Sequence, residues 1–155
     1  MSFQITGLRA AEFTALIGLP EAQLAERGVR RVTADRYPGF PCRVSLVDAQ
    51  PGETLLLLNY EHLPVAGPYR SSYAIYVRES ARDAHLQVDE IPQVLRNRLL
   101  SLRAFSAAGT LLEADVAADG ALPAAIERLL APEEVAYLHV HNAKPGCFAA
   151  RVQRA

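Results

Sequence analysis

Cysteine is scarce in this chain, which has only Cys42 and Cys147 among its 155 residues. Two thiols cannot build the disulfide framework of a small secreted domain. The first residues also lack a basic segment followed by an apolar run, so the sequence predicts no signal peptide. These features predict reduced thiols and a cytoplasmic location. A single Cys42–Cys147 disulfide is the alternative, and it requires that the two side chains lie close together.

Long apolar runs and charge of one sign are lacking as well. The longest aliphatic run covers residues 55–58, which is too short to cross a bilayer, so no membrane association is predicted. The formal net charge is −1 and there is no basic run, which argues against a nucleic-acid partner. Glycine-rich phosphate loops and the Gly-x-Ser-x-Gly elbow are absent, so the commonest nucleotide-binding and hydrolase motifs are excluded.

The pattern of apolar residues predicts an α+β fold. Half of the residues are hydrophobic, and the length suits one domain over residues 1–155. Helical spacing predicts short helices at residues 9–17, 20–27, 92–97 and 123–130, and alternation predicts strands between and after them. Because hairpin-length turns separate most strands, we expect a mostly antiparallel sheet with a few short helices packed on it.

Two predicted hairpins give specific residue pairs. Strands at residues 43–49 and 55–63 would place Arg43 beside Tyr60, and the run at residues 55–58 is apolar on both faces, as in a central strand. In the other hairpin, a three-residue turn that ends at Gly109 would set Arg103 opposite Glu113.

Residues 136–153 hold two of the four histidines, one of the two cysteines and the only lysine. Side chains of a strand alternate between two faces, so His139 and His141 share the face opposite Leu138 and Val140. A hairpin that joins the apolar faces can pair Val140 with Phe148 or with Ala150. Both registers put the same side chains on the polar side: Tyr137, His139, His141, Cys147 and Arg151.

These residues predict a metal site made of His139, His141 and Cys147. Two imidazoles on alternate residues of a strand aim at one point, and a cysteine thiolate can complete a zinc or iron site. Glu61, His62 or Cys42 would have to supply the remaining ligand. The alternative is a partly exposed polar face whose histidines bond to water and to neighbouring groups.

The same residues are the candidates for catalysis. Cys147 would be the nucleophile and His139 or His141 the general base, because a cysteine becomes a good nucleophile only beside a basic or cationic group. Cys42 precedes Arg43 in a proline-rich loop and is the weaker candidate. The alternative for either cysteine is a small buried apolar residue, and we prefer that role for Cys42.

Arginines predict an anion site, since guanidinium groups bind carboxylate or phosphate with two hydrogen bonds. Arg43, Arg70 and Arg103 are the candidates, but the predicted pairing with Glu113 accounts for Arg103, whereas no obvious acidic partner opposes Arg70. The predicted partner is therefore a small anionic molecule held by Arg43 and Arg70, with Tyr69 or Tyr60 nearby.

Three segments carry a family resemblance: residues 40–46 (Phe-Pro-Cys-Arg-Val-Ser-Leu), residues 68–70 running into 75–79, and residues 139–143 with 146–148. Together they resemble the bacterial family catalogued as domain of unknown function 1203. The resemblance extends over nearly the whole chain. It implies that the recurring blocks of the family supply groups able to converge on one pocket: Cys42, Arg43, Tyr69, Arg70, His139, His141, Asn142 and Cys147.

We therefore expect a bacterial cytoplasmic protein with a small-molecule or metal-binding pocket at the last hairpin, built from histidine, cysteine and arginine. Asn142 and Cys42 join Arg43, Arg70 and Tyr69 as ligand-binding candidates. The alternative is a non-catalytic interaction or structural module, which could form a homo-oligomer. Its polar patch would be a subunit or partner interface that includes Tyr137 and Arg151.

Overall fold

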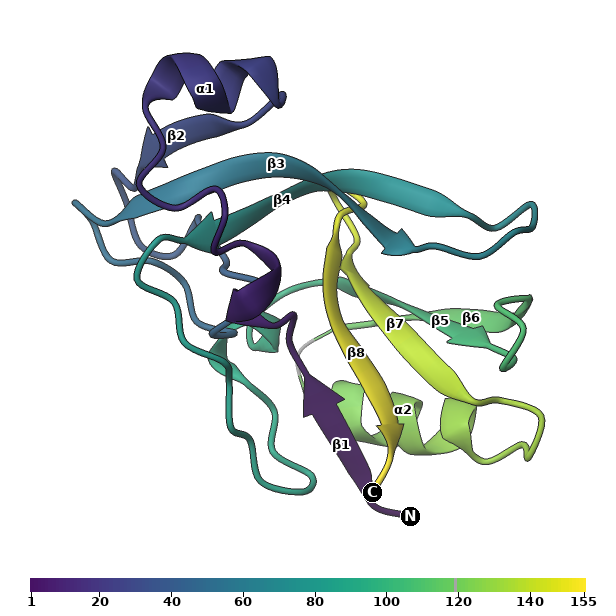
Figure 1. Cartoon of the computed structure of the whole chain (residues 1–155). Helices are drawn as coiled ribbons and strands as arrows, with labels where there is room; N and C mark the ends of the chain where they lie inside the picture. The colour runs from purple at the N-terminus through teal and green to yellow at the C-terminus, as the bar shows by residue number, and fades with distance from the viewer. Residues whose placement is uncertain (119) are drawn as a thin grey trace.

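The computed structural model describes residues 1–118 and 120–155, which form two antiparallel sheets with short helices beside them (Figure 1). One sheet has the strand order β1-β8-β7-β5-β6, and the other has the order β2-β3-β4. The predicted α+β class is confirmed, although the strands divide between two sheets. The strands are β1 (Phe3–Thr6), β2 (Arg30–Thr33), β3 (Thr54–Leu63), β4 (Ser71–Arg78), β5 (Leu100–Phe105), β6 (Leu111–Ala117), β7 (Tyr137–Asn142) and β8 (Phe148–Arg154).

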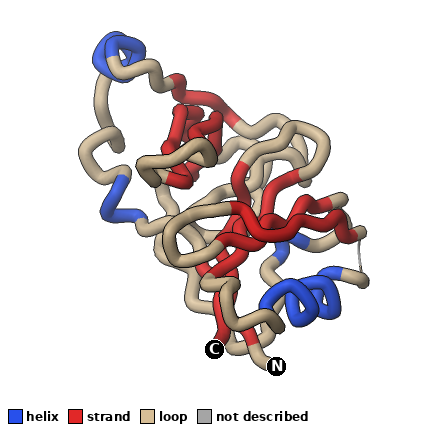
Figure 2. The backbone as a smooth tube through the Cα atoms, turned by 90° about the vertical axis from the view of Figure 1, so that its right-hand side faces the viewer, coloured by secondary structure: helices blue, strands red, loops and turns tan. Residues whose placement is uncertain are grey.

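The helices are short and lie at the outside of the molecule, with the strands between them (Figure 2). The helices predicted at residues 20–27 and 123–130 are confirmed as α1 (Glu21–Glu26) and α2 (Leu122–Leu130). A single 3₁₀ turn, η2 (Gln93–Leu95), forms within residues 92–97. Only η1 (Ala10–Glu12) forms within residues 9–17, where Phe13 is the one buried side chain, so a longer helix there would gain little from packing.

Each sheet has its own hydrophobic core. One face of the five-stranded sheet packs on α2, which buries Ile126 and Leu129 against Leu102, Val140 and other strand residues. The three-stranded sheet packs on the N-terminal helical segments and on the loop at residues 42–44. β3 is the middle strand of that sheet, as its apolar run predicts. β1 pairs with β8, so the two termini lie side by side (Figure 1).

Residues 43–49 do not form the predicted strand. Two isolated bridges hold the segment, and Arg43 donates its backbone N–H to Tyr76 at 3.1 Å, so the predicted neighbour Tyr60 is wrong. The cause is close packing against the end of β1. A Cβ on Gly7 would lie 2.7 Å from the carbonyl oxygens of Arg43 and Val44, and Leu8 N–H bonds to Arg43 at 2.8 Å. This contact bends the chain and fixes Arg43 in the interior.

The hairpin of β5 and β6 has the predicted turn but not the predicted register. An irregularity between Ala104 and Phe105 shifts the pairing by one residue, so Arg103 pairs with Ala114. A one-residue shift moves each side chain to the other face of the sheet. Glu113 accordingly bonds to Arg128 of α2 at 3.0 Å, and the predicted pair of Arg103 with Glu113 is wrong.

Candidate functional site

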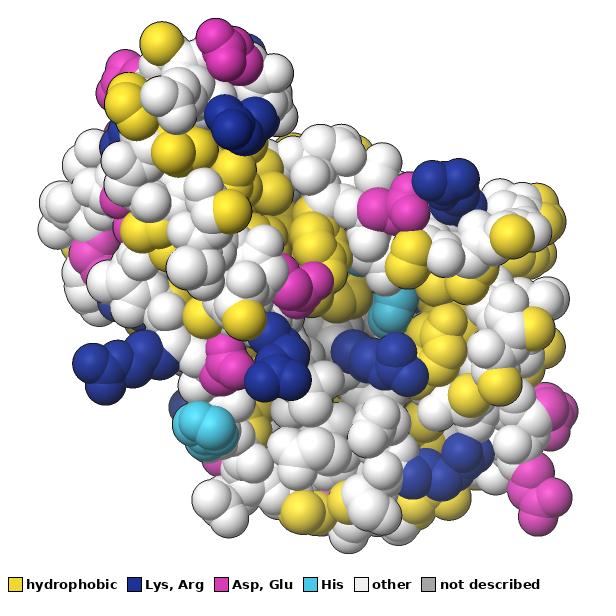
Figure 3. All heavy atoms as spheres, in the orientation of Figure 1, with side chains coloured by type: hydrophobic (Ala, Val, Ile, Leu, Met, Phe, Trp, Pro, Cys, Tyr) yellow, Lys and Arg dark blue, Asp and Glu magenta, His cyan; other side chains and the backbone are white. Residues whose placement is uncertain are grey.

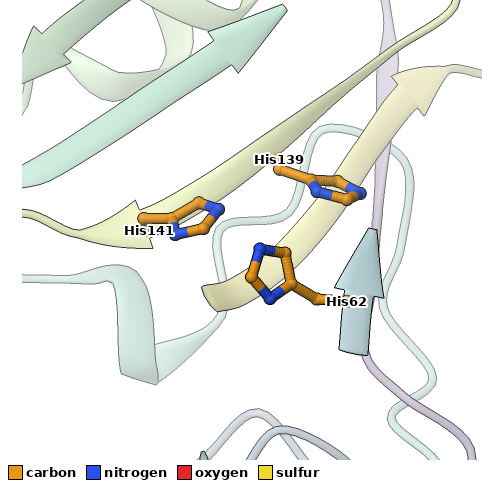
Figure 4. Close-up of side chains that lie close together, drawn as sticks. All are labelled: His62, His139 and His141. Atoms are coloured by element: carbon orange, nitrogen blue, oxygen red, sulfur yellow. The ribbon is translucent and has the colours of Figure 1, made fainter. Parts of the chain in front are cut away.

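Three histidines meet where the end of β3 crosses β7 of the other sheet. His62 comes from β3, while His139 and His141 come from β7, and their rings point toward one another (Figure 4). One potential ligand atom from each ring lies within 4.8 Å of the others. The face in Figure 3 has a histidine side chain within a hollow, beside hydrophobic and basic side chains. The two sheets thus bring together residues that are far apart in the sequence.

A bulge in the last hairpin determines which side chains join the histidines. Val140 pairs with Ala150, which is one of the two predicted registers, but the pairing then shifts and His141 pairs with Phe148. Phe148 therefore faces the histidines instead of the apolar core. Asn142, next along β7, takes the other face, and its backbone N–H bonds to Cys147 at 2.9 Å.

Cys147 consequently does not join the predicted metal site. Its Sγ atom is the acceptor of a contact from the Asn142 amide at 3.5 Å, on the side of the strand away from His139 and His141. The prediction that Cys147 shares a face with these histidines is wrong, because the bulge reverses the alternation assumed for residues 147 and 148. His62, one of three candidates for the remaining ligand, takes its place.

Aromatic rings enclose the histidine cluster. His62 stacks on Phe148 with ring centroids 5.3 Å apart and planes 11° from parallel. His139 makes edge contacts with Phe148 at 5.0 Å and with Phe105 at 5.4 Å. The side chains of His139 and His141 are buried, at 3% and 1% exposure. His139 and His141 are therefore largely removed from water, and His62 is half-buried.

Burial keeps all three imidazoles neutral at neutral pH. It lowers the pKa of His139 to about 3 and that of His141 to about 4. The pKa of His62 is also lowered, first by burial and then by the charge of Arg103. Neutral imidazoles carry the lone pairs that metals bind, so the cluster would not have to release protons before it coordinates a cation.

Hydrogen bonds leave several ring nitrogens open. His141 donates its Nδ1–H to the carbonyl oxygen of Gly146 at 2.9 Å, which leaves a lone pair on its Nε2 atom. The buried Nδ1 atoms of His62 and His139 have no hydrogen-bond partner among the described residues. A buried polar atom without a partner costs about 1–3 kcal/mol. A metal ion between the three rings would bind the nitrogens that face one another, one from each ring.

Two arginines border the cluster and place positive charge on either side of it. Arg103 and Arg151 both pair with His139, from the strands on either side of β7. The Arg151 guanidinium lies over the Tyr137 ring, 4.1 Å from its centroid. No carboxylate of the described residues forms an ion pair with either arginine. The site therefore combines neutral metal ligands with cations able to hold an anion.

A separate cavity of about 520 Å³ opens on the other side of the last hairpin. It takes in some of the predicted site residues but none of the histidines. Arg43, Asn142 and Cys147 line it, together with Lys144 and Arg98. The single pocket predicted at this hairpin is thus divided between two sites.

The remaining predicted residues lie elsewhere. Arg70 is exposed and forms an ion pair with Glu61 at 2.9 Å, so it does have an acidic neighbour. Tyr69 is 38% exposed and its ring lies 6.5 Å from that of Phe105. Cys42 is fully buried and its Sγ accepts the backbone N–H of Arg78 at 3.3 Å, outside the cavity. The described structure has both cysteines as free thiols.

Three residues have a larger place at the site than the sequence predicts. His62 was one of three possible ligands, and only the packing of one sheet on the other singles it out. Arg103 was assigned to Glu113 and instead borders the histidines. Tyr137, named as part of a possible interface, is 7% exposed and packs on Phe105.

Comparison with known proteins identifies the family of the chain but no individual relative. The sequence model of the family described as "Protein of unknown function (DUF1203)" matches residues 39–154. These residues include all three histidines and the whole lining of the cavity. No curated protein and no solved structure matches the chain. Among the described residues, no helix has the length and apolar character needed to span a membrane.

Proposed function

Because the chain belongs to the DUF1203 family, we propose its function from the geometry of the site: it binds a divalent transition metal, zinc in the first place, through His62, His139 and His141. The observation that carries this proposal is the convergence of three neutral imidazoles from two different sheets, with His139 and His141 buried and His62 half-buried. Two of them have a buried nitrogen that lacks a hydrogen-bond partner. We place the protein in the bacterial cytoplasm as part of the same proposal, in keeping with its two free cysteines.

The arrangement suits a zinc ion with one open position. Three imidazoles and one water or ligand make the four-coordinate set common in functional zinc sites. Nitrogens bound to one zinc ion lie about 3.3 Å apart, so atoms that are within 4.8 Å need to move together by at most about 1.5 Å. The hydrogen bond from His141 to Gly146 orients one ligand, as outer-sphere bonds do at metal sites.

Charge indicates what the metal would hold at its open position. Three neutral ligands leave both charges of a zinc ion uncompensated, and Arg103 and Arg151 add to them. An anion at the open position offsets this excess, so the partner that we propose is a small anionic molecule that binds to the metal and to Arg103. Iron is the second choice of metal, because imidazole also suits it but iron sites usually include a carboxylate.

The test is the metal content of the untagged protein, measured by elemental mass spectrometry after dialysis against zinc and removal of excess metal. We expect about one zinc per chain in the native protein, and loss of zinc in His62→Gln and His139→Gln. His85→Gln is the matched control, since His85 is exposed and lies outside the cluster. The proposal fails if the native protein retains no metal, or if His85→Gln loses as much as His62→Gln.

A second candidate is the non-catalytic interaction module. Strand β6 is an edge of its sheet, and Leu112 and Val116 on it are 43% and 58% exposed. Unpaired edge strands with apolar side chains readily pair with another chain. The occupant proposed is a second copy of this protein. Light scattering would then give a dimer that Val116→Lys converts to a monomer, whereas a native monomer rejects this candidate.

A further inference from the structure

We propose that the cavity on the other side of the last hairpin is a second ligand site, and that it takes a small organic carboxylate with an apolar body. The cavity of about 520 Å³ lies within the range of small-molecule sites. It contains none of the three histidines, so this proposal is independent of the metal proposal. His141 and Asn142 are adjacent in β7 but belong to different sites.

The buried charge of Arg43 is the main reason to expect an anion. Arg43 is 2% exposed, and its guanidinium donates to the carbonyl oxygens of Phe148 at 2.7 Å and Pro41 at 2.5 Å. These bonds position the group but bring no negative charge. No described carboxylate forms an ion pair with Arg43. A buried charge without a counterion is costly, and an anion in the cavity would compensate it.

The other basic groups of the cavity do not supply the negative charge that Arg43 lacks. Arg98 is already paired with the buried carboxylate of Asp48 at 2.8 Å. Lys144 is exposed and lines the cavity without an ion pair. The cavity therefore has a buried unpaired cation in its wall and a second cation on its exposed side. A monoanion with one planar carboxylate matches the fork of a guanidinium.

Asn142 adds a second polar side chain to the wall of the cavity. It is 7% exposed and lines the cavity, and its buried Oδ1 atom has no hydrogen-bond partner among the described residues. Asn142 and Arg43 both contact Cys147, which places the amide next to the guanidinium. The polar part of the wall is therefore a buried cation with an amide beside it, which suits the carboxylate end of a ligand.

The rest of the wall is largely apolar and would contact the apolar body of the ligand. Two tyrosines and several aliphatic side chains line it: Pro41, Leu57, Tyr73, Tyr76, Leu99 and Pro145. Tyr73 and Leu99 are 44% and 46% exposed, so they are accessible to an entering molecule. Apolar walls with a few convergent polar groups are typical of sites for small organic molecules.

The test uses 4-phenylbutyrate as the probe and its neutral analogue 4-phenylbutanamide as the control, each titrated calorimetrically into the untagged protein. A probe of this size should bind with a Kd on the order of 1 mM or below. We expect the carboxylate to bind at least about tenfold more tightly than the amide, because only the carboxylate compensates Arg43. Equal affinity for both probes, or binding of neither, would overturn the proposal.

Variants distinguish this cavity from other basic surfaces. Asn142→Asp puts a carboxylate beside Arg43, so the chain would supply its own counterion and the probe should bind at least about tenfold more weakly. Lys144→Gln should weaken binding by a smaller factor. Arg82→Gln is the matched control, since it removes the same charge from an exposed residue outside the cavity. Unchanged binding in Asn142→Asp, or equal losses in Lys144→Gln and Arg82→Gln, would contradict the assignment.

Alkylation of Cys147 gives an independent readout in the native protein. Cys147 lines the cavity, whereas Cys42 is buried outside it. Peptide mass spectrometry after N-ethylmaleimide treatment should show that 4-phenylbutyrate slows modification of Cys147 and leaves the rate at Cys42 unchanged. If both rates change equally, the probe acts on the stability of the fold and not at the cavity. Zinc content is measured on the same samples, so failure of either proposal is recognised separately.

Discussion

His62 stacks on Phe148, and this pair joins the two sheets at the histidine cluster. The rings are 5.3 Å apart and nearly parallel, although one residue belongs to β3 and the other to β8. Phe148 also contacts His139 and His141 edge-on. A single aromatic side chain therefore positions all three candidate ligands, and its place depends on the bulge that precedes it.

The metal-free protein should lose stability as the pH falls from about 6.5 to about 4. Burial lowers the pKa of His139 to about 3 and that of His141 to about 4, whereas unfolded histidine has a pKa near 6.5. In this window the unfolded chain binds protons that the folded chain does not, so acid favours unfolding. Each such histidine contributes a slope of about 1.4 kcal/mol per pH unit.

Urea unfolding at several pH values, with chelator present, tests this expectation. The variant His139→Leu should have a flatter pH dependence than the native protein, and His85→Leu should have the native dependence. Equal slopes for all three proteins would mean that His139 is already accessible to protons in the folded state.

Replacement of Cys147 should not release the metal. Cys147 lies on the side of β7 away from the histidines, so Cys147→Ser should keep the zinc stoichiometry of the native protein. The hairpin register predicted from the sequence, which has no bulge, would make Cys147 a metal ligand. That register predicts loss of zinc in Cys147→Ser. Elemental analysis of the purified variant, with His62→Gln as the positive control for loss, decides between the two arrangements.

Gly146→Ala should weaken zinc binding through His141. Gly146 has a φ of 81° and its carbonyl oxygen accepts the Nδ1–H of His141. An alanine in this left-handed conformation costs about 1–2 kcal/mol of stability. Displacement of the carbonyl should also lower zinc affinity by about tenfold, as for other outer-sphere changes.

Gly18→Ala is the control for Gly146→Ala, because Gly18 has a φ of 79° with nothing near its Cβ position and lies outside the site. Both variants should lose similar free energy of unfolding, but only Gly146→Ala should lose zinc affinity in a competition titration. Equal zinc affinities would show that the bond to Gly146 does not orient His141.

Asp48→Asn should destabilise the fold strongly. The Asp48 carboxylate is fully buried and accepts hydrogen bonds from Arg98 at 2.8 Å, Gln93 at 3.0 Å and Gly39 at 3.2 Å. Burial acts to raise the pKa of Asp48, but Arg98 and the other donors hold it below its usual value. Loss of the charge should cost about 3 kcal/mol.

The matched change is Asp35→Asn, since Asp35 forms an exposed ion pair with Arg36. That variant should lose no more than about 0.5 kcal/mol in urea unfolding. A loss in Asp48→Asn as small as that in Asp35→Asn would show that the buried pair contributes little.

Local patterns predicted most of the elements and part of the polar face of the last hairpin. The 3.6-residue spacing of Ile126, Leu129 and Leu130 marked α2, and the His-x-His alternation put His139 and His141 on one face. These inferences depend on short-range periodicity, which the sequence carries directly. The family resemblance was equally accessible, because residues 39–154 match the family.

The composition of the site was harder to predict because it depends on two bulges and on contact between sheets. Because of the irregularity at Val140 and His141, Phe148 faces the histidines in place of Cys147. Because of the irregularity at Ala104 and Phe105, Arg103 does not pair with Glu113. A strand pattern has a period of two, so one extra residue reverses each later assignment. The approach of His62 is a long-range contact with no local signal.

X-ray absorption spectroscopy of the zinc-loaded protein tests the central claim most directly, because it reports which atoms bind the metal. The account predicts three nitrogen ligands at about 2.0–2.1 Å and an additional oxygen, with no sulfur shell near 2.3 Å. The same spectrum is expected for Cys147→Ser. A zinc–sulfur distance in the native protein, or a shell of oxygens without imidazole scattering, would contradict the three-histidine site.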